Sequence, residues 1–259
     1  MFAALIVFCG VLGLAIGSFL NVVIYRVPRG MSVVAPRSAC PNCGTAIQGL
    51  DNIPVVSWLL LRGRCRHCEA AISPRYLLVE LGTGVVFAAT AARIGPHWDL
   101  PAYLVFFAGL ICLACIDQEL MVLPKKIVYP LTVAVLALLA IAAVADHRWH
   151  AYLVGCLCGV AWFALFLALN VASPRSLGFG DVRLSFVLGL ATGWLGVGYA
   201  VLAFFSANLV GAIVGVTLMA SQRLARGDRV PYGVFLALGC AVAIFAGPVL
   251  LRPFAHLSV

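Results

Sequence analysis

Long apolar runs, separated by short polar stretches, make up most of this chain. Most runs approach the roughly 20 residues that a helix needs to cross a bilayer. We predict eight of them, over residues 2–24, 76–93, 101–116, 127–145, 151–170, 182–194, 196–219 and 233–251. The runs at 101–116 and 182–194 are short for a crossing, so they either extend past these limits or lie in a thinned or protein-lined region. The pattern predicts an all-α polytopic membrane protein with about eight transmembrane helices.

Composition supports a membrane protein. Hydrophobic residues make up 64% of the 259 residues and charged residues only 10%, whereas a soluble domain carries about 25% charged residues. The first run lacks a basic start and has no small-residue cleavage site, so we expect a retained span rather than a removed signal peptide. We expect no internal repeat.

The 17 basic residues outnumber the 9 acidic ones. In so apolar a chain this excess indicates topology, since basic residues collect in cytoplasmic loops, and nucleic acid is not an expected partner. Fourteen basic residues fall on one predicted side: Arg26, Arg29, Arg37, Arg62, Arg64, Arg66, Arg75, Lys125, Lys126, Arg175, Arg183, Arg223, Arg226 and Arg229. The other side has three: Arg93, Arg148 and Arg252. We therefore expect residues 25–75, Asp117 and Asp181 at the cytoplasmic side of the bilayer.

Two Cys-x-x-Cys pairs lie in the polar stretch 25–75, namely Cys40 with Cys43 and Cys65 with Cys68. Four thiolates at this spacing suit one tetrahedral structural zinc ion. A reducing cytoplasm disfavours disulfides, and a stretch without a large apolar core would gain folding free energy from a metal. A redox pair or unmetallated thiols are the alternatives, and His67 is expected to be a bystander. The other six cysteines lie in apolar runs and are read as small hydrophobic residues.

Two aspartates lie near the membrane and face the same predicted side. Asp117 ends the run 101–116, and Asp181 follows Gly178-Phe179-Gly180. A lone Asp there is commonly a helix cap, but two carboxylates held together share one proton, so one activates water while the other donates a proton. We predict Asp117 and Asp181 as catalytic aspartates and residues 178–180 as an active-site loop.

Glu80 is the other acidic residue inside an apolar run. It is either a polar contact within the helix bundle or part of a proton path.

An ordered series of motifs points to a known family. The series comprises Gly17-Ser-Phe-Leu-Asn-Val-Val-Ile-Tyr-Arg-Val-Pro28, the two Cys-x-x-Cys pairs, Asn52-Ile-Pro-Val-Val-Ser-Trp58, Ile116-Asp117 with Leu123-Pro124, Gly178-Phe-Gly-Asp-Val-Arg-Leu184, and Val230-Pro-Tyr-Gly-Val-Phe-Leu236. From about residue 10 to residue 240, the chain resembles the bacterial prepilin peptidases, or type IV leader peptidases. Each motif alone is weak, and their order is specific.

The resemblance implies an aspartic endopeptidase of the inner membrane. Such enzymes remove the basic leader of type IV prepilins and of type II secretion pseudopilins, after a glycine at the cytoplasmic face. Many members then methylate the new N-terminal residue with S-adenosylmethionine, whose contacts the sequence does not identify. Asp117 and Asp181 match the family's catalytic aspartates, and the four cysteines match its metal-binding residues. The implied domains are a first span (1–24), a cytoplasmic zinc-binding segment (25–75) and a transmembrane peptidase domain (76–259).

Three positions depart from the family's usual pattern. Lys125 stands where Asp is common, Asp51 where Glu is common, and Leu77 where Pro is common. These departures bear on substrate detail and methylation rather than on the aspartates. The alternatives are a transporter with paired carboxylates, a non-catalytic assembly factor whose aspartates cap helices, and a presenilin-like GxGD protease without the four-Cys segment.

Overall fold

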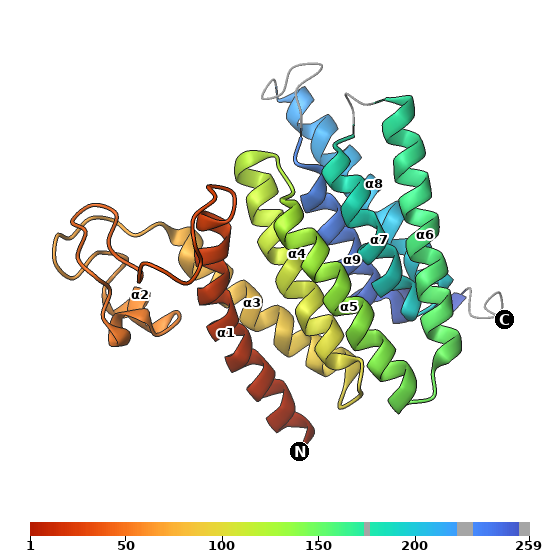
Figure 1. Cartoon of the computed structure of the whole chain (residues 1–259), viewed down its shortest axis with the longest axis horizontal. Coiled ribbons are helices and arrows are strands. Elements are labelled where there is room, and N and C mark those ends of the chain that lie inside the picture. Colours follow the sequence, from red (N-terminus) through yellow and green to blue (C-terminus); the bar gives the residue numbers. More distant parts are fainter. Residues whose placement is uncertain (174–176, 222–229, 254–259) are drawn as a thin grey trace. The chain divides into compact units, whose positions relative to one another are not determined.

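A computed structural model describes residues 1–173, 177–221 and 230–253 as a helical chain (Figure 1). The α-helices are α1 (Phe2–Arg26), α2 (Val56–Leu60), α3 (Pro74–Ile94), α4 (Leu100–Leu120), α5 (Lys125–Ala145), α6 (Trp149–Ala172), α7 (Phe179–Trp194), α8 (Val197–Ala220) and α9 (Tyr232–Leu250), with a 3-10 turn η1 at Gly49–Asn52. Within the described residues, extended pairing is limited to two isolated β-bridges. The chain divides into two compact units, Met1–Pro96 and His97–Val259.

All eight predicted apolar runs form helices. Seven helices in the described part of the chain are long and apolar enough to cross a membrane, namely α1, α3, α4, α5, α6, α8 and α9. The predicted all-α multi-pass fold is therefore confirmed. The short run 101–116 does extend, because α4 reaches Leu120. Asp117 thus lies in the last turn of this helix, near its end as expected.

In the first unit, glycines allow α1 and α3 to pack closely. A Cβ atom on Gly13 would lie 2.7 Å from the carbonyl oxygen of Thr83, and one on Gly17 would lie 2.7 Å from Cα of Glu80. Small residues at such positions let membrane helices approach backbone to backbone. Nearby, the Asn21 side-chain amide donates a hydrogen bond of 3.1 Å to the carbonyl of Tyr76, at the start of α3. These contacts join the two helices that flank the four-Cys segment.

In the second unit, α7 is the most enclosed helix. It contacts α5, α6, α8 and α9, and 12 of its 16 residues are buried. A Cβ on Gly155 or Gly159 of α6 would lie 2.9 Å from a carbonyl oxygen of α7, so these glycines set the close contact between the two helices. The Tyr103 hydroxyl of α4 donates to the carbonyl of Ala191 at 2.7 Å. Protein thus lines α7, which is why 16 residues suffice.

A buried carboxylate holds the C-terminal end of α7. Asp99 is only 3% exposed, and its Oδ2 accepts hydrogen bonds from the Trp194 indole at 2.9 Å and from Arg148 at 3.2 Å. The Arg148 guanidinium also lies over the Trp194 ring, 4.8 Å from its centroid. Because a buried charge is tolerated only with partners, this cluster ties together the α3–α4 loop, the α5–α6 loop and the end of α7.

Trp194→Phe should destabilise the second unit by about 1.5–3 kcal/mol, since it removes a hydrogen bond to a buried charged acceptor. Thermal unfolding in detergent measures the effect. Trp149→Phe is the matched control, because Trp149 is 51% exposed. Equal melting temperatures for the two variants would show that the Asp99 cluster contributes nothing to stability.

Candidate functional site

Asp117 lies near the end of α4, against the beginning of α9. Asp117 is only 6% exposed, and its Oδ2 accepts a 2.8 Å hydrogen bond from the Gly233 backbone N–H. The Val234 N–H also donates to this carboxylate. Both donors belong to the first turn of α9, whose N–H groups have no partner within their own helix. A helix N-terminus favours negative charge, so α9 stabilises the Asp117 carboxylate.

Asp181 is the third residue of α7 and is 8% exposed. Its carboxylate accepts a hydrogen bond from the backbone N–H of Gly178, the residue that precedes the helix. Oδ1 has no hydrogen-bond partner among the described residues. Phe179 and Gly180 form the first helical turn, so the prediction of a loop at these two positions was wrong, while Gly178 is the N-cap. Asp181 is therefore held by a helix rather than by a flexible segment.

Leu123, in the α4–α5 connection, lies where three helix ends meet. A Cβ on Gly180 would be 2.9 Å from Cβ of Leu123, and a Cβ on Gly233 would be 3.3 Å from Cδ2 of Leu123 and 2.9 Å from Oδ2 of Asp117. The Asp117 carboxylate lies close enough to Asp181 to interact with it electrostatically. The structure thus brings together two acidic residues that are 64 positions apart in the sequence.

Sequence reasoning assigned no role to Tyr232 or to Arg183, which follows Asp181 by two positions. Tyr232, at the start of α9, interacts electrostatically with Asp181, and its hydroxyl donates to Oδ1 of Asn208 at 3.1 Å. The Arg183 guanidinium lies 4.6 Å from the Phe179 ring centroid and 5.9 Å from that of Tyr129. Tyr232 lies in the Val-Pro-Tyr-Gly stretch, one of the motifs that the chain shares with the family. That shared motif was the one sequence signal that pointed to Tyr232.

The four predicted metal ligands form a cluster in the first unit. The sulfur atoms of Cys40, Cys43, Cys65 and Cys68 all lie within 4.8 Å of one another, and His67 is not part of the group. The sulfurs of Cys40 and Cys68 are 3.8 Å apart. A tetrahedral zinc ion with Zn–S bonds of about 2.3 Å separates its sulfurs by about 3.8 Å. The cluster therefore has the composition and size to hold one metal ion.

The two Cys-x-x-Cys pairs are copies of one structural unit, so the expectation of no internal repeat was wrong. In the first copy, the Cys40 N–H donates to the carbonyl of Thr45, and a β-bridge joins Ala39 to Ala46. In the second copy, the Cys65 N–H donates to Ala70, and a β-bridge joins Arg64 to Ala71. The residue after each second cysteine, Gly44 or Glu69, has a positive φ. Each copy thus presents two thiols from one tight turn.

Local hydrogen bonds favour the thiolate form of two of the four cysteines, Cys43 and Cys65. The Thr45 hydroxyl, 3.3 Å from Sγ of Cys43, together with the Thr45 backbone lowers the pKa of Cys43 to about 6. Backbone N–H groups of Cys68 and His67 lower the pKa of Cys65. Metal ions bind the deprotonated thiol, so these contacts favour the coordinating form of Cys43 and Cys65.

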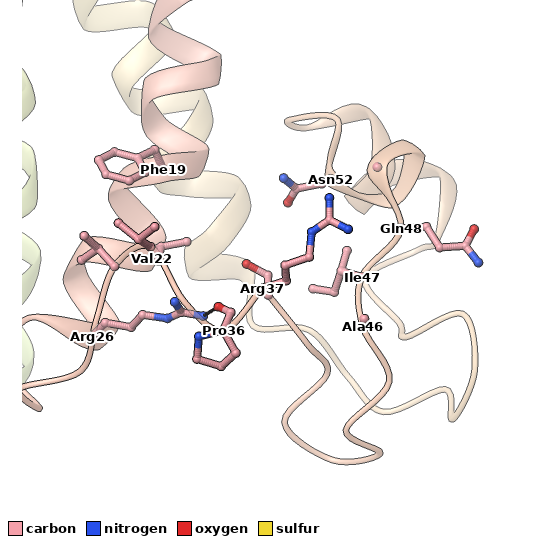
Figure 2. A pocket seen from close by; sticks show the side chains of 13 residues that line it. Phe19, Val22, Arg26, Pro36, Arg37, Ala46, Ile47, Gln48 and Asn52 are labelled. Carbon is pink, nitrogen blue, oxygen red and sulfur yellow. Dashed lines mark hydrogen bonds between the residues drawn. The ribbon is translucent and has the colours of Figure 1, made fainter.

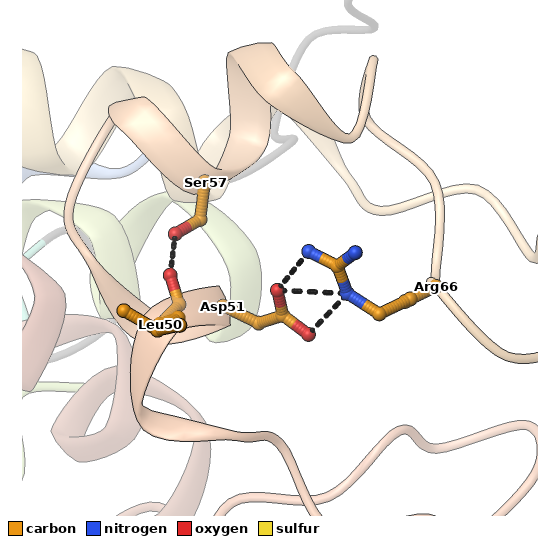
Figure 3. A network of polar contacts seen from close by, with 4 residues as sticks. All are labelled: Leu50, Asp51, Ser57 and Arg66. Carbon is orange, nitrogen blue, oxygen red and sulfur yellow. Dashed lines mark hydrogen bonds and ion pairs between the residues drawn. The ribbon is translucent and has the colours of Figure 1, made fainter.

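Two acidic residues of the first unit, Glu80 and Asp51, have structural partners. Glu80 accepts a 2.7 Å hydrogen bond from the Val55 backbone N–H, where Val55 has a φ of 65°. This contact favours a role for Glu80 as a structural polar contact over a role in a proton path. Asp51 pairs with Arg66 through both carboxylate oxygens (Figure 3). The Arg66 hydrogen bonds lower the pKa of Asp51.

Cys43→Ser should lower the metal bound by the purified protein, because a hydroxyl is a poor substitute for a thiolate ligand. Elemental analysis of metal per chain measures this, and proteolysis of residues 25–75 should become faster since the metal supplies folding free energy. Cys156→Ser in α6 is the control. Equal metal content in both variants would contradict a four-sulfur site.

Comparison with known proteins places this chain in a family. The model of the Type IV leader peptidase family matches residues 104–216, and that of the Bacterial Peptidase A24 N-terminal domain matches residues 11–94. A relative from Burkholderia pseudomallei (strain 1026b) is 34% identical over 93% of this chain and 85% of its own length. One from Pseudomonas aeruginosa is 33% identical over 94% of this chain and 91% of its own length, and one from Myxococcus xanthus is 41% identical over 82% of this chain and 63% of its own.

All three relatives carry the name prepilin leader peptidase/N-methyltransferase. No solved structure matches the chain. The fold and the two candidate sites define a multi-pass membrane protein with a carboxylate pair and a four-Cys cluster. The chain belongs to the type IV leader peptidase family.

Proposed function

We propose that this chain is a membrane aspartic endopeptidase that removes the leader of type IV prepilins and of type II secretion pseudopilins. It then methylates the new N-terminal residue. The observation that carries the peptidase is the pair formed by Asp117 and Asp181, both buried and placed together by the ends of α4 and α7. The family membership and the names of the relatives support the substrate class and the second activity.

The carboxylate pair suits hydrolysis of a peptide bond. Two adjacent buried carboxylates cannot both ionise cheaply, so the pair holds one proton. Asp117 accepts hydrogen bonds from backbone N–H groups of α9, which stabilise its ionised form, so it is the better base. Asp181 has an oxygen without a hydrogen-bond partner among the described residues, so it is the better acid. Asp117 takes a proton from water as the oxygen attacks the scissile carbonyl, and Asp181 protonates the carbonyl oxygen. Collapse of this tetrahedral intermediate breaks the C–N bond, and a proton goes to the leaving amine.

The predicted topology suits this substrate. A prepilin has a basic leader followed by an apolar helix, and the helix can lie in the bilayer while the scissile bond stays at the cytoplasmic interface of the inner membrane. The charge asymmetry of the loops supports this orientation. Arg175, Arg223, Arg226 and Arg229 contribute to that asymmetry and lie outside the described residues.

The first unit supplies the candidate metal site. The four cysteines would hold a zinc ion that stabilises residues 25–75. S-adenosylmethionine would supply an electrophilic methyl group to the new N-terminal amine, which would lose a proton on methylation.

A transport function explains the same two carboxylates less well. Ion and proton carriers place such groups near the middle of the membrane on interrupted helices. Here Asp117 is near the end of α4 and Asp181 is in the first turn of α7. A protein that only caps helices with these aspartates would not need a buried oxygen such as Oδ1 of Asp181, which has no hydrogen-bond partner among the described residues.

Asp117→Asn and Asp181→Asn should each lower the rate of prepilin cleavage by at least about 10³-fold, since each removes a group that transfers a proton. The measurement is cleavage of purified prepilin in detergent, followed by mass. Asp51→Asn is the control, because Asp51 belongs to the other unit and pairs with Arg66. Substantial cleavage by either dyad variant, with normal insertion, would rule out the two-aspartate mechanism.

Gly233→Ala should slow cleavage by about 10²-fold, because a misplaced catalytic group has an effect of this size. The added Cβ would lie 2.9 Å from Oδ2 of Asp117 and push the carboxylate away. Gly215→Ala, on α8, is the matched control because a Cβ there meets nothing within 4 Å. Full activity of Gly233→Ala would mean that the Asp117 position is not critical.

A further inference from the structure

A pocket of about 420 Å³ lies in the first unit, between α1 and the four-Cys segment. This volume is within the range of about 300–1,000 Å³ typical of sites for small molecules and cofactors. Figure 2 shows Phe19 and Val22 on the α1 side and Ile47 and Asn52 on the facing loop. Both sides belong to the unit that the N-terminal family model covers.

The two arginines that line this pocket differ in their hydrogen bonding. Arg26 is buried and donates to the carbonyls of Ser32 and Pro36 at 2.9 and 2.8 Å, so it shapes the wall. Arg37 makes no hydrogen bond or ion pair with any described residue. Its side chain extends between α1 and the facing loop (Figure 2).

Side-chain amides complete the polar lining. Gln48 and Asn52 also make no side-chain hydrogen bond within the described residues, and Ser38 contributes a hydroxyl to the lining. None of the described residues that line the pocket is acidic. The lining therefore offers one available cation, several neutral hydrogen-bonding groups and an apolar wall.

We infer that this pocket is the binding site for S-adenosylmethionine, with Arg37 pairing with the carboxylate of its methionine part. This inference rests on the proposed methyltransferase function. The apolar wall formed by Phe19, Val22 and Ile47 suits the adenine ring, and Gln48 and Asn52 suit the hydroxyls and ring nitrogens. An Arg–carboxylate pair is frequently bidentate, so it fixes orientation as well as adding affinity. The Phe19 ring is also a suitable neighbour for the sulfonium cation.

A ligand with a carboxylate and a planar base matches Arg37, the neutral hydrogen-bonding groups and the apolar wall. The pocket lies in the first unit, whereas Asp117 and Asp181 lie in the second.

The test is equilibrium binding of S-adenosylmethionine and S-adenosylhomocysteine to the purified, metal-loaded full-length protein. Arg37→Gln should weaken binding of both by about tenfold or more, which is typical for the loss of a charge-assisted contact. Arg62→Gln is the matched control: Arg62 is also exposed, lies three residues before the first cysteine of the second copy, and is outside the pocket. Both variants should cleave prepilin at the wild-type rate.

A second measurement locates the ligand without a substitution. Ultraviolet cross-linking of radiolabelled S-adenosylmethionine to the wild type should label peptides from residues 33–38 or 46–52. Equal binding by Arg37→Gln and wild type, or label confined to residues 97–259, would overturn the pocket assignment. A wild type that cleaves prepilin but binds neither compound would overturn both this inference and the methyltransferase part of the proposed function, while leaving the peptidase part intact.

Discussion

Two buried carboxylates at one end of a helix bundle are the constraint on which the second unit depends. A charge in apolar surroundings is tolerated only where partners compensate for the lost water. Asp117 obtains its compensation from the first-turn N–H groups of α9, through a 2.8 Å bond to Gly233. That contact requires α9 to begin beside the end of α4, and it requires a residue without a side chain at position 233. Leu123 then closes the space between Gly180 and Gly233.

The position of Asp181 depends on α7, which is enclosed by other helices. Burial on nearly all sides frees α7 from having to match the thickness of the bilayer, so it can be 16 residues long. Its far end is anchored by Trp194, which donates to the buried Asp99. A catalytic group built on a rigid, anchored element is held more accurately than one on a loop. The helical placement of Phe179 and Gly180 therefore serves the proposed chemistry.

Much of the fold could be predicted from the pattern of apolar residues, because lipid and water impose strong length and charge limits on membrane helices. Helix ends were less predictable: the pattern could not show that α4 continues through Asp117 or that α7 starts at Phe179, since polar residues at a membrane face fit either a helix end or a loop. The repeat in the four-Cys segment was missed because the two copies share little beyond the cysteines and an Ala-Ile pair at 46–47 and 71–72.

Contacts between distant segments were harder still. The bond between Gly233 and Asp117 joins residues 116 apart, and neither periodicity nor composition carries information about such a pair. The same holds for the pocket, whose walls come from α1 and from loops that only the folded four-Cys segment brings into place. Cysteine spacing, by contrast, predicted the metal cluster because tetrahedral coordination itself dictates which residues must meet.

The central claim is that Asp117 and Asp181 share one proton. Infrared spectroscopy of the full-length protein at neutral pH tests it directly, because a protonated carboxyl has its own C=O stretching band and the chain has only 9 acidic residues. We predict one such band that is absent from Asp181→Asn, shifted in Asp117→Asn and unchanged in Asp51→Asn. A wild-type spectrum without a protonated-carboxyl band, or with one that neither dyad substitution alters, would contradict the account.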